Sequence, residues 1–190
     1  MRIKVVSLLL IFAASVSMHA QNYMANNTIL IVRHAEKPLA GSGLTPRGEA
    51  RAQLYAKYFM PFKEGEIEIQ VDSLYAGADS ANSVRPRLTL EPLARASGLT
   101  LHHDIGTKDT AGFASYLRST AHGSHPLISW RHGEIPELIT ALGGNPGTLF
   151  PEGKWPGEVF DWVVLLKTDG AGKVIVEKLI KEQLEVKVAP

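Results

Sequence analysis

The sequence has no cysteine among its 190 residues. Disulfide bridges, thiolate metal sites and lipid attachment through a cysteine are therefore excluded. Long runs of like charge are also missing, and the formal net charge is only +1. Without a basic cluster, neither a nucleic-acid surface nor a polybasic membrane anchor is expected. The length and the hydrophobic fraction of 45% predict one globular domain with a substantial core.

Only one long hydrophobic run is present, and it lies at the N-terminus. The uncharged stretch Val5–Ser17 follows Arg2 and Lys4 and ends close to the small residue Ala20. This order is typical of a secretory signal peptide, and the run is short for a membrane span, which needs ~20 residues. Residues 1–20 are therefore predicted to be a cleaved signal peptide, with an uncleaved anchor as the alternative. Cleavage would change the net charge from +1 to −1 and release an exported protein, periplasmic or secreted, without stable membrane association.

Short apolar runs alternate with amphipathic stretches over the rest of the chain. The continuous apolar, β-branched run Thr28–Arg33 predicts a buried strand. Three further short strands are predicted at Asp72–Gly77, Leu99–His103 and Pro126–Trp130. Helical periodicity predicts helices at Leu44–Phe59, Val84–Gly98, Thr110–His122 and Glu134–Gly144. Strands that alternate with helices predict an α/β fold, a three-layer αβα sandwich around a mostly parallel sheet.

Local signals refine the ends of these elements. Thr45 suits a helix N-cap and Pro46 the first helical position, while Gly98 suits a helix C-terminus. The segment Asn145–Gly157 is dense in Pro and Gly and is predicted to be a loop. A final hairpin is predicted to join Val159–Lys167 to Lys173–Ile180.

Arginine and histidine side chains follow the carboxyl ends of the predicted parallel strands. Arg33 and His34 end the first strand, Arg85 opens the helix after the second, and His132 follows the fourth. Ligands bind at this edge of such sheets. Arginine binds phosphoryl oxygens in fork geometry, and a neutral imidazole can attack phosphorus. The helix that begins near Glu134 would also direct backbone N–H groups toward an anion.

Four ordered segments resemble the histidine phosphatase superfamily, the phosphoglycerate mutase-like or histidine acid phosphatase clan. They are "VRHAEKP", "GLTPRGEARAQ", the pair Arg85 and Thr89 in "NSVRPRLTLEPLA", and "SWRHGEIPELITALGG". The resemblance covers the chain from about Thr28 to Gly144. It implies a phosphoglycerate mutase-like fold and one histidine phosphatase-like domain over residues 21–190, in a small branch without a large cap.

The resemblance also implies roles for single residues. His34 corresponds to the nucleophile that becomes phosphorylated, and Arg33, Arg85 and His132 correspond to the substrate-binding phosphate pocket. No cofactor is expected, and the family needs no metal. The stretch "GADSANSV" before Arg85 departs from the small residues usual there.

The general acid is the least defined member of the expected site. Some branches of the family have an aspartate directly after the second histidine, where this chain has Gly133. Glu134, one residue later, is the leading candidate, and a carboxylate at a helix start is otherwise a partner of the helix dipole. Asp104 and Asp109 lie where other branches keep their acid.

Several other residues have alternative interpretations. Arg87 is equally consistent with surface charge and with the pocket rim, and Arg131 is expected to face away from the pocket because neighbours on a strand alternate. The same alternation argues against a metal site at His102 and His103. The aromatic residues Trp155, Phe160 and Trp162 are expected to pack in the core or a loop. Glu36 and Lys37 suit either a pocket gate or a solvated turn.

The leading hypothesis is a phosphomonoesterase that transfers a phosphoryl group to His34 and then to water. The alternatives are a mutase-type phosphotransferase on the same pocket and a non-catalytic phospho-ligand binder. The expected partner is a phosphorylated small molecule or a phosphoprotein, and not a nucleic acid. The sequence defines neither the natural substrate nor the oligomeric state.

Overall fold

The computed structural model describes residues 22–188, and the predicted signal peptide falls outside this range. A six-stranded sheet in the order β5-β4-β6-β1-β7-β8 forms its centre. The six strands are β1 (Thr28–Arg33), β4 (Ser73–Ala76), β5 (Leu101–His102), β6 (Pro126–Trp130), β7 (Trp162–Thr168) and β8 (Val174–Lys181). β7 pairs antiparallel with both neighbours, whereas β5, β4, β6 and β1 are parallel.

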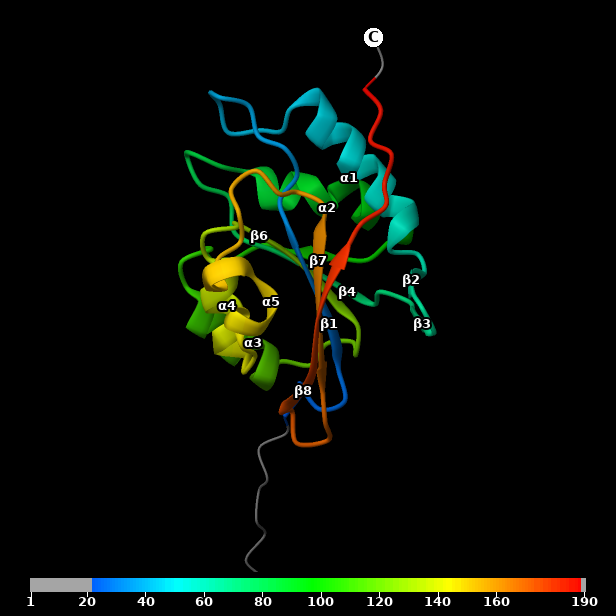
Figure 1. Cartoon of the computed structure of the whole chain (residues 1–190), viewed down its shortest axis with the longest axis vertical. Helices are drawn as coiled ribbons and strands as arrows, with labels where there is room; N and C mark the ends of the chain where they lie inside the picture. Colours follow the sequence, from blue (N-terminus) through cyan, green and yellow to red (C-terminus); the bar gives the residue numbers. More distant parts are fainter. Residues whose placement is uncertain (1–21, 189–190) are drawn as a thin grey trace, which may run out of the picture.

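Helices cover both faces of this sheet, as the alternating pattern predicted (Figure 1). α1 (Pro46–Tyr58) and α2 (Arg85–Ser97) pack on one face. α3 (Thr110–Ser119), α4 (Ile135–Leu142) and α5 (Pro146–Leu149) pack on the other. β1 is buried along its whole length because it lies inside the sheet and is covered on both faces.

The predicted helix caps are confirmed. The Thr45 side chain accepts a hydrogen bond from the Gly48 amide, and Pro46 occupies the first helical position of α1. Gly98 ends α2 in the left-handed conformation, with a φ of 72°.

Three expectations for the secondary structure were incomplete. The strand expected over Leu99–His103 is reduced to the two residues of β5, which pairs only with β4. The segment expected to be a loop, Asn145–Gly157, contains α5 and a 3₁₀ turn at Pro151–Gly153. A small hairpin of β2 (Phe62–Glu64) and β3 (Ile67–Ile69) was not expected, and it stands outside the main sheet.

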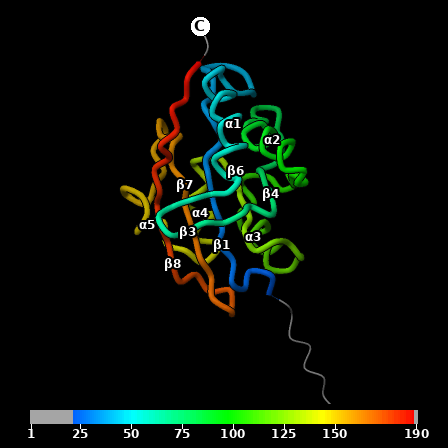
Figure 2. The backbone as a smooth tube through the Cα atoms, turned by 90° about the vertical axis from the view of Figure 1, so that its right-hand side faces the viewer, coloured from blue at the N-terminus to red at the C-terminus, as the bar shows by residue number. Residues whose placement is uncertain are grey.

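The chain after β8 returns to the helix that follows β1. Figure 2 shows this C-terminal segment rising to the end of the molecule at which α1 lies. Arg47 on α1 donates a hydrogen bond to the Val186 carbonyl at 3.3 Å. Within residues 22–188, no helix combines the length and apolar content that crossing a membrane requires.

Candidate active site

His34 lies at the carboxyl end of β1 and is almost fully buried, with an exposed fraction of 3%. Its Nδ1 lies 2.8 Å from the Ala35 carbonyl oxygen. A carbonyl oxygen only accepts, so Nδ1 carries the proton of the neutral ring and Nε2 keeps its lone pair. Burial, together with the positive charges of Arg33 and Arg85, lowers the pKa of His34 to about 3. The ring is therefore neutral and nucleophilic at physiological pH.

Arg33 is the most deeply buried charged side chain beside His34, with no exposed surface. Its Nη1 donates to the carbonyl oxygens of Gly157, at 2.5 Å, and Val159, at 3.0 Å. Its Cζ lies 3.7 Å from the ring centroid of Phe160. Among the described residues, neither Nε nor Nη2 of Arg33 has a hydrogen-bond partner. A buried guanidinium with unpaired donors is costly unless an anion binds it, so this side chain is prepared for an anionic ligand.

Arg85, the first residue of α2, is held by the loop that follows β1. Its Nε donates to the Gly43 carbonyl at 2.9 Å, and its Nη1 to Ser83 Oγ at 3.2 Å. Thr89 connects α2 to the loop that follows His34, since its Oγ1 accepts from the Ala35 amide at 2.8 Å and donates to the Arg85 carbonyl at 2.8 Å. The arginine and the threonine four residues later thus form one unit that places Arg85 beside His34.

His132, after β6, is half-buried and also neutral. Burial, followed by the charges of Arg33, Lys37 and Arg131, lowers its pKa to about 4. Its Nδ1 is buried without a hydrogen-bond partner within residues 22–188. Arg33, Arg85 and His132 are all close enough to His34 to influence its pKa, so these four side chains lie in one region of the structure.

The segment "GLTPRGEARAQ" holds the loop after His34. The Glu36 carbonyl accepts from the Thr45 amide at 2.9 Å, and the Glu36 carboxylate lies 2.9 Å from Arg51 Nη2. A Cβ on Gly48 would lie 2.5 Å from the Glu36 carbonyl oxygen, so only glycine allows this close approach. Glu36 is therefore a structural ion-pair residue and neither a gate nor a solvated turn residue.

The three acid candidates from the sequence lie in different surroundings. Glu134 is the N-cap residue of α4, and its carboxylate lies 3.7 Å from Arg131 Nε. Asp109 is the N-cap of α3 and accepts from the Gly112 amide at 3.0 Å. Asp104 lies after β5. In the sheet β5 is separated from β1 by three strand spacings, a distance of ~14 Å.

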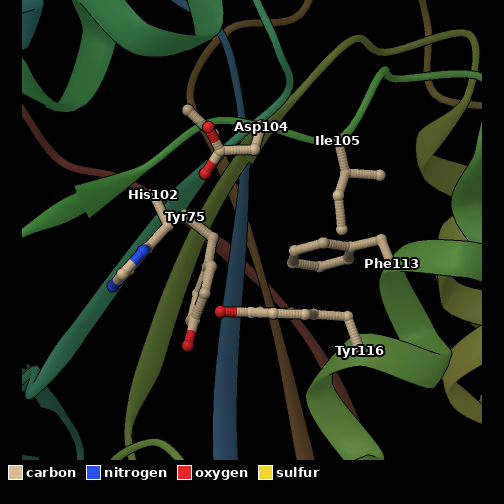
Figure 3. A pocket seen from close by; sticks show the side chains of 7 residues that line it. Tyr75, His102, Asp104, Ile105, Phe113 and Tyr116 are labelled. Carbon is tan, nitrogen blue, oxygen red and sulfur yellow. The ribbon is translucent and has the colours of Figure 1, made fainter. Parts of the chain in front are cut away.

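Asp104 instead lines a hollow of about 220 Å³ at the edge of the sheet. Figure 3 shows the rings of Tyr75, Phe113 and Tyr116 around this hollow, with Asp104 on its upper side. The His102 ring stacks on Tyr75 with a centroid distance of 5.4 Å. Within residues 22–188, no group of three or more His, Cys, Asp or Glu side chains is arranged to hold a metal ion.

Two expectations around α4 differ from the structure. The amides of Glu134 and Ile135 both donate to the Arg131 carbonyl, and Pro136 has no N–H, so the start of α4 has little to offer an anion. Arg131 lies beyond the last residue of β6, so strand alternation does not apply to it. Its positive charge reaches the site and contributes to the lowered pKa of both Arg85 and His132.

The structure also defines the surroundings of Arg87 and of the three aromatic residues near the end of the loop before β7. Arg87 forms ion pairs with Asp79 at 2.8 Å and Glu91 at 3.0 Å, which assigns it to surface charge. Trp155 and Trp162 are buried and pack in the core, as expected. Phe160 does more than pack in a loop, because its ring lies against the Arg33 guanidinium.

Glu158 is the charged site residue that the sequence analysis missed. It lies between the two carbonyl groups that bind Arg33, in the loop that leads to β7. Its negative charge acts on the pKa of both Arg33 and His132, in the direction opposite to burial. The only sequence signal was a carboxylate inside a Pro- and Gly-rich turn, which does not indicate its long-range neighbours.

Solved structures with the same architecture include both mutases and phosphatases. Phosphoglycerate mutase from Plasmodium falciparum is 16% identical, with a TM-score of 0.52 over 87% of this chain and 95% of that one. This chain has the phosphoglycerate mutase-like fold. A protein from Agrobacterium tumefaciens described as the phosphohistidine phosphatase SixA is 16% identical, with a TM-score of 0.51 over 82% and 96%. A mycobacterial glucosyl-3-phosphoglycerate phosphatase is 14% identical, with a TM-score of 0.50 over 84% and 100%.

No protein-family model matches the sequence, and no curated protein matches it either. The likeness is therefore one of fold, at identities of 14–16%. The phosphoglycerate mutase-like fold confirms the three-layer architecture that the sequence predicted. It also places Arg33, His34, Arg85 and His132 at the carboxyl edge of the sheet, where this fold class binds ligands.

Proposed function

We propose that the protein is a histidine phosphatase, a phosphomonoesterase that forms a phosphohistidine on His34. The observation that supports this most is the state of His34. Its ring is neutral, its Nδ1–H donates to the Ala35 carbonyl, and its Nε2 has no hydrogen-bond partner among residues 22–188. It stands next to Arg33, which is buried and keeps two unpaired donor atoms among these same residues. A nucleophile and an anion-binding group are thus held side by side.

The proposed reaction has two steps. The Nε2 lone pair of His34 forms a bond to phosphorus while the ester P–O bond breaks and the leaving oxygen takes a proton. Arg33, Arg85 and His132 donate hydrogen bonds to the phosphoryl oxygens as charge spreads over them. Water then attacks phosphorus, the N–P bond breaks and inorganic phosphate leaves.

Hydrolysis is favoured over transfer because the site is open. Between Arg85 and His132, all of which is described, the chain builds α2, β5, α3 and β6 without an additional cap. A hollow of about 410 Å³ beside the site, lined in part by Ser83, Lys108 and Arg131, leaves room for a leaving group and for water. A mutase must instead exclude water from its phosphorylated intermediate.

A panel of phosphomonoesters offered to residues 21–190 tests this proposal. Release of inorganic phosphate is expected, with His34→Ala as the blank. Phosphate-dependent thermal protection without release would indicate the binding role, and transfer to an added alcohol in preference to water would indicate the mutase.

The proposed chemistry uses the charges of Arg33, Arg85 and His132 and no metal ion. Treatment with a chelator should leave the activity unchanged, whereas vanadate, a phosphate-like oxyanion, should inhibit. A requirement for an added divalent ion would contradict the proposed mechanism.

A further inference from the structure

The turn from Trp155 to Phe160 forms one wall of the site and is anchored at several points. The Val159 amide donates to the Pro156 carbonyl at 3.2 Å, which closes a tight turn. The Trp155 indole, itself buried, donates to the Val159 carbonyl at 2.9 Å. Arg33 Nη1 binds the carbonyl groups of Gly157 and Val159. The backbone on both sides of Glu158 is thus fixed to the arginine of the phosphate pocket.

The same turn lies against the second histidine. A Cβ on Gly157 would be 3.9 Å from His132 Nε2. Glu158 is exposed at the tip of the turn, and its charge influences both Arg33 and His132. Glu158 is thus close enough to Arg33 and His132 for its charge to act on both, and it stays exposed to solvent.

Two other carboxylates near the site are held by arginines. Glu36 is bound by Arg51, and Glu134 faces Arg131. Neither Glu134 nor Asp104 is among the leading influences on the pKa of His34 or His132. Within residues 22–188, Glu158 forms no ion pair within 4.0 Å. It is therefore the carboxyl group in the turn bound by Arg33 that has no ion-pair partner among the described residues.

We propose that Glu158 is the general acid and base of the reaction, an inference that rests on the proposed function. A bound phosphoryl group next to a carboxylate favours its protonated form, because like charges repel. As the ester P–O bond breaks, the Glu158 carboxyl group gives its proton to the leaving oxygen. In the second step the carboxylate accepts a proton from the attacking water, and the N–P bond to His34 breaks.

A pair of substrates tests this role. An alkyl alcohol leaves poorly without a proton, whereas nitrophenolate leaves readily. Glu158→Gln should therefore lower kcat/KM for an alkyl phosphate by ~10²–10⁴-fold, the usual range for general acid catalysis. The loss on 4-nitrophenyl phosphate should be much smaller.

Two further variants sharpen the comparison. Glu152→Gln removes an exposed carboxylate from the same loop and should leave both rates unchanged. Glu134→Gln should change kcat/KM for the alkyl phosphate and for 4-nitrophenyl phosphate by the same factor. Equal losses on both substrates in Glu158→Gln, no loss on either, or a selective loss in Glu134→Gln instead would overturn the role of Glu158. The proposed function would survive each of these results, because the wild-type protein would still release phosphate from both esters; if it released none, the proposed function itself would fail.

Discussion

At the scale of single residues, two histidines at the carboxyl edge of the sheet are held neutral. Burial and nearby positive charge lower the pKa of His34 to about 3 and that of His132 to about 4, from an ordinary value of 6.5. A nucleophile needs this neutral form, whereas a positive site for phosphate needs the arginines to stay charged. In the proposed mechanism these two roles fall to different side chains.

The first prediction is that both rings titrate well below 6.5 in the free protein. Below 6.5 the unfolded chain takes up protons that the folded histidines resist. The free energy of unfolding should therefore fall as the pH is lowered from 6.5 toward 3. NMR titration of the ring protons, assigned with His34→Asn and His132→Asn, measures the two pKa values. Values near 6.5 for both would contradict the buried, positively charged environment described above.

The second prediction compares two arginines on the same helix. Arg85 is placed beside His34 through Gly43, Ser83 and Thr89, and its removal should lower kcat/KM by ~10²–10³-fold, as for the loss of one donor to a transition state. Arg87, two residues on, is engaged in surface ion pairs, and Arg87→Ala should leave kcat/KM unchanged. Comparable losses in the two variants would contradict the assignment of Arg85 to the phosphate pocket.

Sequence patterns placed the central site residues because each follows directly from the end of a predicted strand or the start of a helix. Arg33, His34 and His132 continue from β1 and β6, so finding the strands also located the side chains. Glu158 and Phe160 could not be found in this way. Their places depend on hydrogen bonds to Arg33, more than 120 residues earlier in the chain, and on the buried Trp155.

At the scale of helices and strands, local capping chemistry was the most informative signal. Thr45 and Gly98 mark ends of α1 and α2 because their interactions lie within a few residues of the chain. The short elements β2, β3 and α5 gave no comparable signal, since three or four residues carry too little periodicity. β5 was expected to be longer. It lies at the edge of the sheet, and its pairing with β4 extends over two residues, Leu101 and His102.

The third prediction separates capping from catalysis at Asp109. Its carboxylate accepts a hydrogen bond from Gly112 at the start of α3. Asp109→Ala should therefore lower the free energy of unfolding by ~1 kcal/mol, while Asp109→Asn should retain most of the cap. Urea unfolding measures both variants. Unchanged stability in Asp109→Ala, together with a loss of turnover, would return Asp109 to the candidates for the general acid.

At the scale of the whole molecule, the sheet edge gathers segments that are distant in the sequence. The loop after β1, the start of α2, the end of β6 and the turn before β7 meet at the site (Figure 1). The α/β layering was predictable, because alternation of strands and helices allows few other arrangements. After α4, the final hairpin of β7 and β8 was also predicted and is confirmed. The turns between α4 and β7 were not predicted, because they are set by contacts with the rest of the fold.

The fourth prediction concerns export. If the basic start and apolar run of residues 1–20 act as a signal peptide, the protein isolated from its native source should begin at or near Gln21. Mass measurement of the intact chain gives the start directly. A chain that begins at Met1 and sediments with membranes would support an uncleaved anchor.

The central claim is that His34 carries the phosphoryl group, and trapping the intermediate tests it most directly. Wild-type protein is mixed with a labelled phosphomonoester, quenched within milliseconds and digested, with His34→Ala treated in parallel. We expect label on the peptide containing His34, in a bond that is labile to acid and stable to alkali, as a phosphoramidate is. Label that survives acid, label on another residue, or turnover undiminished in His34→Ala would contradict the account.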